Sequence, residues 1–163
     1  MIIILGRFQL FSQDLENLKK SYYKKDYESY RIGFLEELKN GYSSEIPIPF
    51  WRNYFLLEPS LDLFEQQLEL YRISRRPICN FLKIGIEKAF ISRNLDLGNQ
   101  WGSAYFQDCK MTKTAHKTLY YYSCILFLSQ NKIDFGKVTD WLLLQNLKPE
   151  LKNKIETLIR ANE

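Results

Sequence analysis

The stretch "KTAHKTLYYYSCILFL", residues 113–128, decides the fold class. Each residue of a helix turns by about 100°, so three successive tyrosines fan over about 200°. Apolar side chains then surround nearly the whole segment, which is typical of a helix in the middle of a domain. We therefore predict that residues 113–130 form a central helix.

Outside this stretch, apolar residues recur three and four positions apart along almost the whole chain, and alternating runs are nearly absent. This periodicity predicts an all-α protein. The first helix is expected from the N-cap Ser12 to about Asn40, either bent near residues 24–26 or packed on different neighbours along its two halves. Further helices are expected over residues 51–57, 60–74, 77–91, 95–109, 134–146 and 149–161.

Short connections between six to eight helices favour consecutive antiparallel hairpins. We predict an irregular helical bundle or a short solenoid-like stack of such hairpins, in a single domain over residues 1–163, a length that suits one domain. The clearest loop is "GYSSEIPIPFW", residues 41–51. The opening residues "MIIILGRF", 1–8, are either a lone strand or the start of a helix.

Composition limits the classes of protein to consider. Hydrophobic residues make up 45% of the chain and charged residues 26%, as in an ordinary globular protein. Apolar runs are too short for a signal peptide or a membrane span, so we expect a soluble, cytoplasmic protein that does not bind membranes. The net charge of +4 permits an acidic partner without requiring one.

The three cysteines, Cys79, Cys109 and Cys124, are odd in number and widely spaced, without a C-x-x-C pair. This argues against a disulfide framework and against a zinc site, and it predicts that two of the three are buried free thiols. With a single histidine, a metal ion would need carboxylate ligands alone. We expect no metal and no cofactor.

His116 is the obvious candidate for a catalytic base, but no residue one turn away forms a familiar dyad with it. Cys109 lies seven residues earlier without a local cysteine-enzyme signature. The phosphate-loop, dinucleotide, serine-hydrolase and zinc-protease motifs are all missing. We expect that the protein is not an enzyme, with a Cys–His enzyme as the weaker alternative.

A second pattern, "KKSYYKKDYESYR" at residues 19–31, interleaves lysines with tyrosines. Lysines neutralise phosphates and tyrosines stack on bases, so a nucleic-acid surface is one interpretation. The structural interpretation is favoured, because Tyr23, Tyr27 and Tyr30 have the spacing of core residues and the lysines would form a solvated face. The nucleic-acid alternative would use Lys19, Lys20, Lys24, Lys25, Arg75 and Arg76.

Aromatic residues make up 15% of the chain, and some of them fall at irregular positions where a core is not expected. Trp51 follows the proline-rich loop, and Trp101 lies beside Gly98 and Gly102. Large aromatics near arginine are typical anchors of protein interfaces. The candidate partner-binding residues are Tyr42, Trp51, Arg52, Asp62, Glu65, Glu69, Arg72 and Trp101.

In size and composition, the chain resembles the immunity proteins that bacteria pair with contact-dependent inhibition toxins and other polymorphic toxins. The resemblance rests on no motif, so no residue is carried over from it. It implies a helical inhibitor that covers the active site of a cognate toxin, such as a nuclease or another intracellular toxin. Inhibitors of basic nucleases tend to be acidic, so a chain of +4 implies an acidic toxin surface or a locally acidic inhibitory face, for example around Asp62, Glu65 and Glu69.

Overall fold

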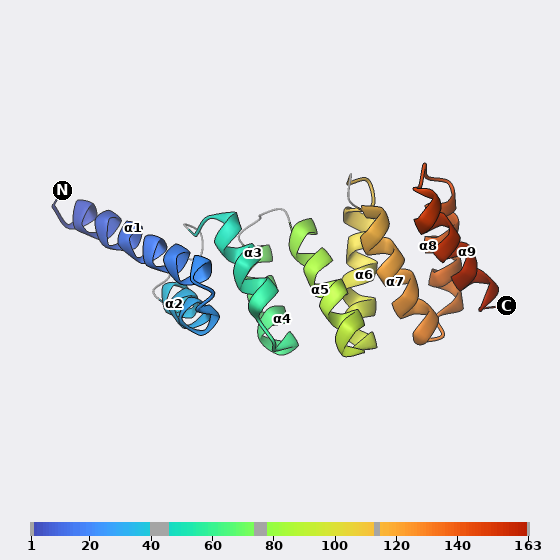
Figure 1. The fold of residues 1–163 in the computed structure, drawn as a ribbon, viewed down its shortest axis with the longest axis horizontal. Helices are drawn as coiled ribbons and strands as arrows, with labels where there is room; N and C mark the ends of the chain where they lie inside the picture. Colours follow the sequence, from blue (N-terminus) through green and yellow to red (C-terminus); the bar gives the residue numbers. More distant parts are fainter. Residues whose placement is uncertain (1, 40–45, 74–77, 113–114, 163) are drawn as a thin grey trace. The chain divides into compact units, whose positions relative to one another are not determined.

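A computed structural model describes residues 2–39, 46–73, 78–112 and 115–162, and these residues form nine helices and no strand. The predicted all-α class is therefore confirmed (Figure 1). Contacts gather in two compact units, Met1–Arg76 and Pro77–Glu163. The single domain expected over residues 1–163 stays a prediction. Within the described ranges, no helix combines the length and the apolar character needed to cross a membrane.

The first unit contains four helices (Figure 1). They are α1 (Ile2–Tyr23), α2 (Tyr27–Lys39), α3 (Ile48–Leu57) and α4 (Leu61–Ile73). The alternative of an opening strand is wrong, because the chain is helical from Ile2 onward. The helix expected at residues 51–57 begins three residues earlier, where Pro49 occupies the first turn that suits a proline.

The expected first helix is divided into α1 and α2 by a tight turn. Lys25 adopts a left-handed backbone with a φ of 61°, which terminates α1. Asp26 then caps α2, because its side chain accepts a hydrogen bond of 3.2 Å from the Ser29 amide. The bend anticipated near residues 24–26 is thus a break between two separate helices, and α1 packs against α2.

Stacked aromatic rings fill the core of the first unit. The Phe34 ring of α2 stacks on Tyr54 of α3 with centroids 4.5 Å apart, and it meets Trp51 edge-on at 5.2 Å. Phe55 in turn lies 4.6 Å from Phe64 of α4. Each such pair contributes about 0.5–1.5 kcal/mol beyond the burial of its surface. This column of rings joins α2, α3 and α4.

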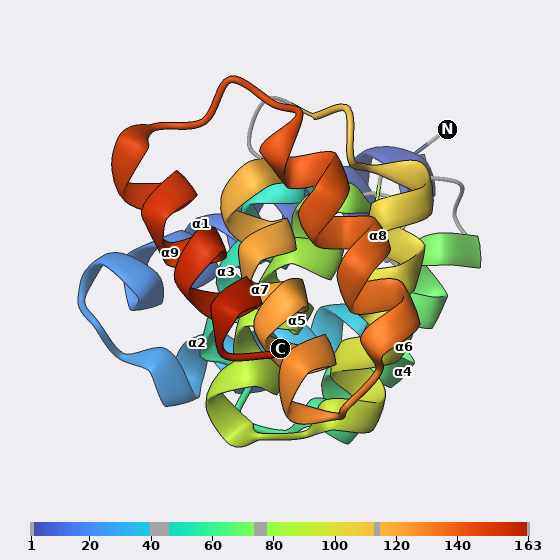
Figure 2. The ribbon, with the colours of Figure 1, turned by 90° about the vertical axis from the view of Figure 1, so that its right-hand side faces the viewer.

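The second unit is built around α7 (Figure 2). Its helices are α5 (Cys79–Ser92), α6 (Leu95–Asp108), α7 (Ala115–Leu128), α8 (Lys132–Leu143) and α9 (Pro149–Arg160). Helix α7 packs against α5, α6, α8 and α9, and it buries Leu119, Tyr122, Ile125 and Leu126. The prediction that this stretch forms a central helix is confirmed.

Two small residues let α6 approach α7 closely. A Cβ atom at Gly98 would lie 2.7 Å from a terminal carbon of Ile125, and one at Gly102 would overlap the ring of Tyr122.

The next helix, α8, begins earlier than the expected residue 134. Asn131 caps it by accepting a hydrogen bond of 3.2 Å from the Asp134 amide.

One prediction about the cysteines is wrong. Cys79, at the start of α5, forms a disulfide with Cys109, at the end of α6. The two helices are neighbours that run in opposite directions, so residues 30 positions apart meet with their Cα atoms 5.6 Å apart. Cys124 alone matches the expectation of a buried free thiol.

Candidate functional site

The tight turn after α1 splits the lysine- and tyrosine-rich segment between two helices and gathers its tyrosines. The ring of Tyr22 lies 5.4 Å from that of Tyr30, 5.8 Å from Tyr27 and 6.4 Å from Tyr23. Only Tyr30 is fully buried, whereas Tyr23 is 75% exposed and Tyr27 is 42% exposed. The expectation that all three spaced tyrosines lie in the core is therefore right for Tyr30 and wrong for the other two.

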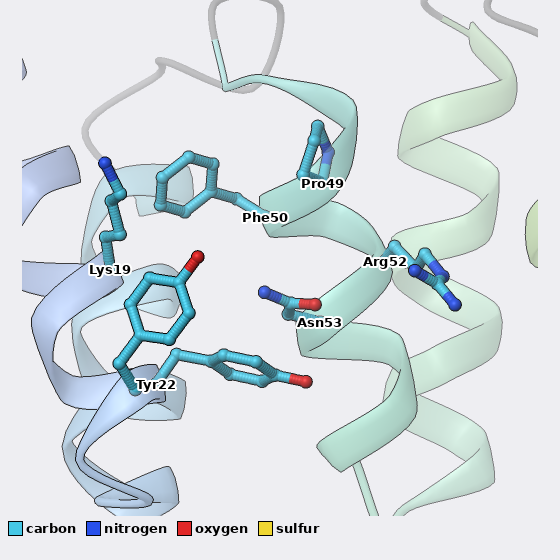
Figure 3. A pocket seen from close by; sticks show the side chains of 7 residues that line it. Lys19, Tyr22, Pro49, Phe50, Arg52 and Asn53 are labelled. Atoms are coloured by element: carbon cyan, nitrogen blue, oxygen red, sulfur yellow. The ribbon is translucent and has the colours of Figure 1, made fainter.

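Tyr30 anchors this cluster to α3. Its hydroxyl donates a hydrogen bond of 2.7 Å to the backbone carbonyl of Phe50. Burial raises the pKa of Tyr30 far above its usual value, so the hydroxyl stays a proton donor at every physiological pH. The first turn of α3 is thereby fixed against α2, with Phe50 facing the tyrosines of α1 (Figure 3).

A pocket of about 390 Å³ lies between the end of α1 and the start of α3 (Figure 3). Its lining combines aromatic walls with two cations and one amide. The lining residues are Lys19, Tyr22, Tyr23, Pro49, Phe50, Arg52 and Asn53. Of the described side chains around it, none is acidic. In Figure 3, Phe50 and Asn53 reach from α3 toward α1, whereas Arg52 extends from the opposite side of α3.

This arrangement suits an anionic group carried on a flat or apolar body. Lys19 and Arg52 are exposed at the rim, where they can pair with a carboxylate or phosphate. Tyrosine and phenylalanine rings offer stacking faces and apolar surface. Lys19 also lies 3.5 Å from Glu16, but both side chains are about half exposed, so this pair holds the lysine only weakly.

The structure gathers few of the predicted site residues in this pocket. Arg52 from the partner-binding set and Lys19 from the nucleic-acid set line it together. Lys20, Lys24 and Lys25 are exposed but do not line it. The predicted residues Tyr42, Arg75 and Arg76 lie outside the described part of the chain.

Both tryptophans proposed as interface anchors belong to the core instead. Trp51 lies within α3, is 1% exposed and packs edge-on against Tyr71 at 5.3 Å. Trp101 lies in the middle of α6 and is 2% exposed. The expectation that they occupy irregular positions outside the core is wrong, because both lie within helices and their side chains are buried.

The four charged candidates of α4 form a separate surface. Asp62, Glu69 and Arg72 are exposed and Glu65 is half-buried. Arg72 pairs with Glu69 of its own helix at 3.4 Å, and both side chains are largely exposed. None of the four lines the pocket between α1 and α3. Their part in binding stays a prediction.

His116 lies in the first turn of α7, half-buried, with its ring 6.1 Å from that of Trp141. The cysteine considered as its partner, Cys109, is engaged in the disulfide. Burial raises the pKa of the remaining thiol, Cys124, which disfavours the reactive thiolate. Among the described residues, no three His, Cys, Asp or Glu side chains are arranged to hold a metal ion.

Sequence reasoning missed two groups of residues. One is the apolar and amide lining of the pocket, namely Tyr22, Phe50 and Asn53. The other is Glu37, a carboxylate that is only 5% exposed. Glu37 lies three residues after the buried Phe34 on the same face of α2, and this helical spacing was the available signal.

Comparison with known proteins finds no matching family model, no matching curated protein and no matching solved structure.

Proposed function

We propose that this protein is a protein-binding inhibitor of the immunity type, which neutralises a cognate bacterial toxin by covering its active site. The pocket between α1 and α3 carries the proposal, because it joins two cations to exposed aromatic rings on a helical surface. Tyrosine and arginine are the residues that most often dominate the binding energy of protein interfaces. No cofactor is part of the proposal.

The chemistry of the pocket suggests what the partner presents there. Two exposed cations and a net charge of +4 favour an acidic segment, and the rings of Tyr22 and Phe50 favour an aromatic or apolar side chain beside it. An acidic patch at a toxin's cleft would resolve the mismatch between this basic chain and the usual acidic inhibitors of basic nucleases.

Growth protection tests the proposal. A candidate toxin, taken from a reading frame next to this gene, is expressed in a bacterium together with the protein or its variants. We expect protection by the natural chain and its loss with the charge reversal Lys19→Glu/Arg52→Glu, together with a rise in Kd of about 100-fold for the purified pair. The matched control is Lys132→Glu/Lys148→Glu, which reverses two exposed lysines outside the pocket.

The proposal fails if the natural chain gives no protection and forms no complex with that toxin. It also fails in its choice of surface if the pocket variant protects as well as the control does. Both variants change the net charge equally, so a general electrostatic effect would weaken both alike.

A nucleic-acid-binding module is the second candidate, because Lys19 shares the pocket with Tyr22 and Tyr23. Stacking on an aromatic side chain contributes about 1–3 kcal/mol per base. This candidate predicts that a labelled single-stranded oligonucleotide binds with an affinity that falls steeply between about 50 and 200 mM salt. A weak anisotropy signal at low salt, equal for the natural chain and Lys19→Glu, rejects it.

The inhibitor proposal places the protein in the cytoplasm. Thiols are kept reduced there, so the pair Cys79 and Cys109 would be open in most molecules. Alkylation of intact cells before lysis measures this directly, since open thiols at both positions take up the label. If neither cysteine is alkylated, the disulfide is closed in the cell, and the proposed site of action would be an oxidising compartment instead.

A further inference from the structure

A second pocket of the first unit lies between α1 and α2 and has a volume of about 180 Å³. Its lining is polar, acidic and made of small residues. The lining residues are Asp14, Asn17, Leu18, Ser21, Ser29, Gly33, Glu36 and Glu37. None of the described side chains that line it is basic. The pocket therefore differs in charge from the one between α1 and α3.

Three carboxylates converge on this pocket from two helices. Asp14 comes from α1, and Glu36 and Glu37 come from α2. Glu37 is only 5% exposed, and its Oε2 atom has no hydrogen-bond partner among the described residues. A buried charge without a partner is costly, and buried acceptors in proteins are nearly always satisfied. A bound cation with N–H donors would satisfy this oxygen.

Small side chains keep the space in front of Glu37 open. Ser21, Ser29 and Gly33 line the pocket, and α1 approaches α2 so closely that a Cβ atom at Gly33 would lie 2.9 Å from a methyl carbon of Leu18. Lys19 and Arg31 do not line the recess; Lys19 forms an exposed, weak pair with Glu16, and Arg31 pairs with the buried Glu58. The protein therefore offers an acidic recess that its own described cations do not fill.

The shape of the recess favours an organic cation over a metal ion. A metal ion requires its ligands within about 2.0–2.6 Å, and the described carboxylates include no group of three arranged for that. A guanidinium group presents five N–H donors in a planar fork, so it reaches acceptors that are spread around a cavity. The serine hydroxyls and the Asn17 amide supply further acceptors beside the carboxylates.

We propose that the recess formed by Asp14, Glu36 and Glu37 binds the guanidinium group of an arginine side chain presented by the partner protein. The buried, unpaired oxygen of Glu37 accepts an N–H bond, and the two outer carboxylates complement the positive charge. This inference rests on the proposed function in one respect, namely that a protein partner exists. The acidic recess would bind a basic group of the partner, whereas the basic pocket between α1 and α3 would bind an acidic one.

A direct test uses a short probe and needs no toxin. The blocked tripeptide acetyl-Gly-Arg-Gly-amide is titrated to 20 mM into the ¹⁵N-labelled full chain, and amide shifts are followed. We expect saturable shifts centred on Ser21, Ser29 and Gly33. The same peptide with citrulline, a neutral isostere of arginine, is expected to shift none of them, because it lacks the charge.

Variants test whether the buried carboxylate of Glu37 is required for arginine binding. Glu37→Gln removes the charge with little change of shape and is expected to weaken arginine binding at least fivefold. Glu87→Gln, at a half-buried carboxylate on α5 outside the recess, is the matched control and is expected to bind as the natural chain does. A well-dispersed spectrum of each variant shows that it is folded.

Several results would overturn the inference. They are equal binding of the citrulline peptide, no shifts around Gly33 at 20 mM, or unchanged binding by Glu37→Gln. Equal or tighter binding of a lysine peptide or of spermidine would overturn the assignment to a guanidinium side chain. If the arginine peptide binds but the toxin is not neutralised, the recess stands and the immunity proposal falls.

Discussion

The carboxylate of Glu58 lies 3.4 Å from the guanidinium of Arg31, and it joins α2 to the junction of α3 and α4. The Glu58 side chain is completely buried, whereas that of Arg31 is 32% exposed. The same carboxylate accepts hydrogen bonds from the Tyr54 hydroxyl at 2.7 Å and from the Ser60 amide at 3.0 Å. One acidic side chain thus fixes three helices of the first unit.

Removing the Glu58 side chain should destabilise the protein. We expect Glu58→Ala to lower the free energy of unfolding by about 3 kcal/mol, because it leaves the Tyr54 hydroxyl and the Arg31 guanidinium without their buried acceptor. Urea denaturation measures the change. Glu69→Ala, which breaks an exposed pair with Arg72, should cost less than about 1 kcal/mol. Equal losses in the two variants would contradict the assigned role of Glu58.

Two glycines of the second unit should respond in opposite directions to alanine. A methyl group at Gly102 overlaps the Tyr122 ring, so Gly102→Ala is expected to destabilise the protein by about 2 kcal/mol. Gly136 has open space around it within α8, so Gly136→Ala should stabilise by about 0.5–1 kcal/mol through helix propensity. Thermal unfolding of both variants checks the difference, and a Gly102→Ala variant as stable as the natural chain would reject the close packing of α6 on α7.

The disulfide between Cys79 and Cys109 closes a loop with a sequence separation of 30 residues. In the chain-entropy description, a loop of that size contributes about 3–4 kcal/mol, so reduction should lower stability by a similar amount. Titration of the purified protein, oxidised in air and then denatured without reductant, should find one thiol, Cys124, and titration after reduction should find three. Three thiols before reduction would contradict the bridge.

Burial, followed by the charges of Asp14 and Glu36, raises the pKa of Glu37 above its usual 4.5. The folded state therefore binds this proton more tightly than the unfolded state does. Its contribution favours folding most below pH 4.5 and is lost as the pH rises through the folded-state pKa. We expect Glu37→Gln to flatten this part of the pH profile and to raise stability at pH 7 by up to about 1 kcal/mol.

Urea denaturation at several pH values between 4 and 7 measures the Glu37 effect on stability, and Glu87→Gln is again the control. A stabilising substitution that also weakens arginine binding is the pattern of a binding group that is kept at a cost to the fold. A loss of stability at pH 7 in Glu37→Gln would show that the carboxylate is structural.

His116 should be dispensable for protection. We expect His116→Ala to lower stability by no more than about 1 kcal/mol, through the lost contact with Trp141, and to leave growth protection unchanged. A folded His116→Ala variant that no longer protects would show that the histidine takes part in binding or in chemistry. His116→Gln keeps a polar side chain of similar size, so it shows whether a loss of protection comes from the imidazole itself or from altered packing.

The helices could be predicted from the sequence because most of them bury one clear face. The spacing of apolar residues predicted the boundaries of α4, α6, α7 and α9 to within a few residues. The turn between α1 and α2 could not be predicted, because Lys25 has no glycine-like signature for its left-handed backbone. Apolar residues keep a helical spacing on both sides of this turn, so two helices looked like one bent helix.

The site was harder to predict than the fold, since it depends on which helices become neighbours. Lys19 and Arg52 were each singled out, but for different functions, and nothing in the sequence joins α1 to α3. Periodicity also misplaced Tyr23, which faces outward at the end of α1. Cys79 and Cys109 illustrate the same limit, because only the packing of α5 on α6 brings them together.

The packing of helices on their near neighbours along the chain has a kinetic consequence. Among the described residues, helices in substantial contact are never more than two places apart in the order of elements, as with α5 and α7 or α7 and α9. Contacts of such short sequence separation close small loops at little entropic cost, and helical proteins of this type fold in microseconds to milliseconds. Neighbouring helices can therefore pair while the ribosome is still making the next one, and a newly made molecule would be folded almost as soon as it is released.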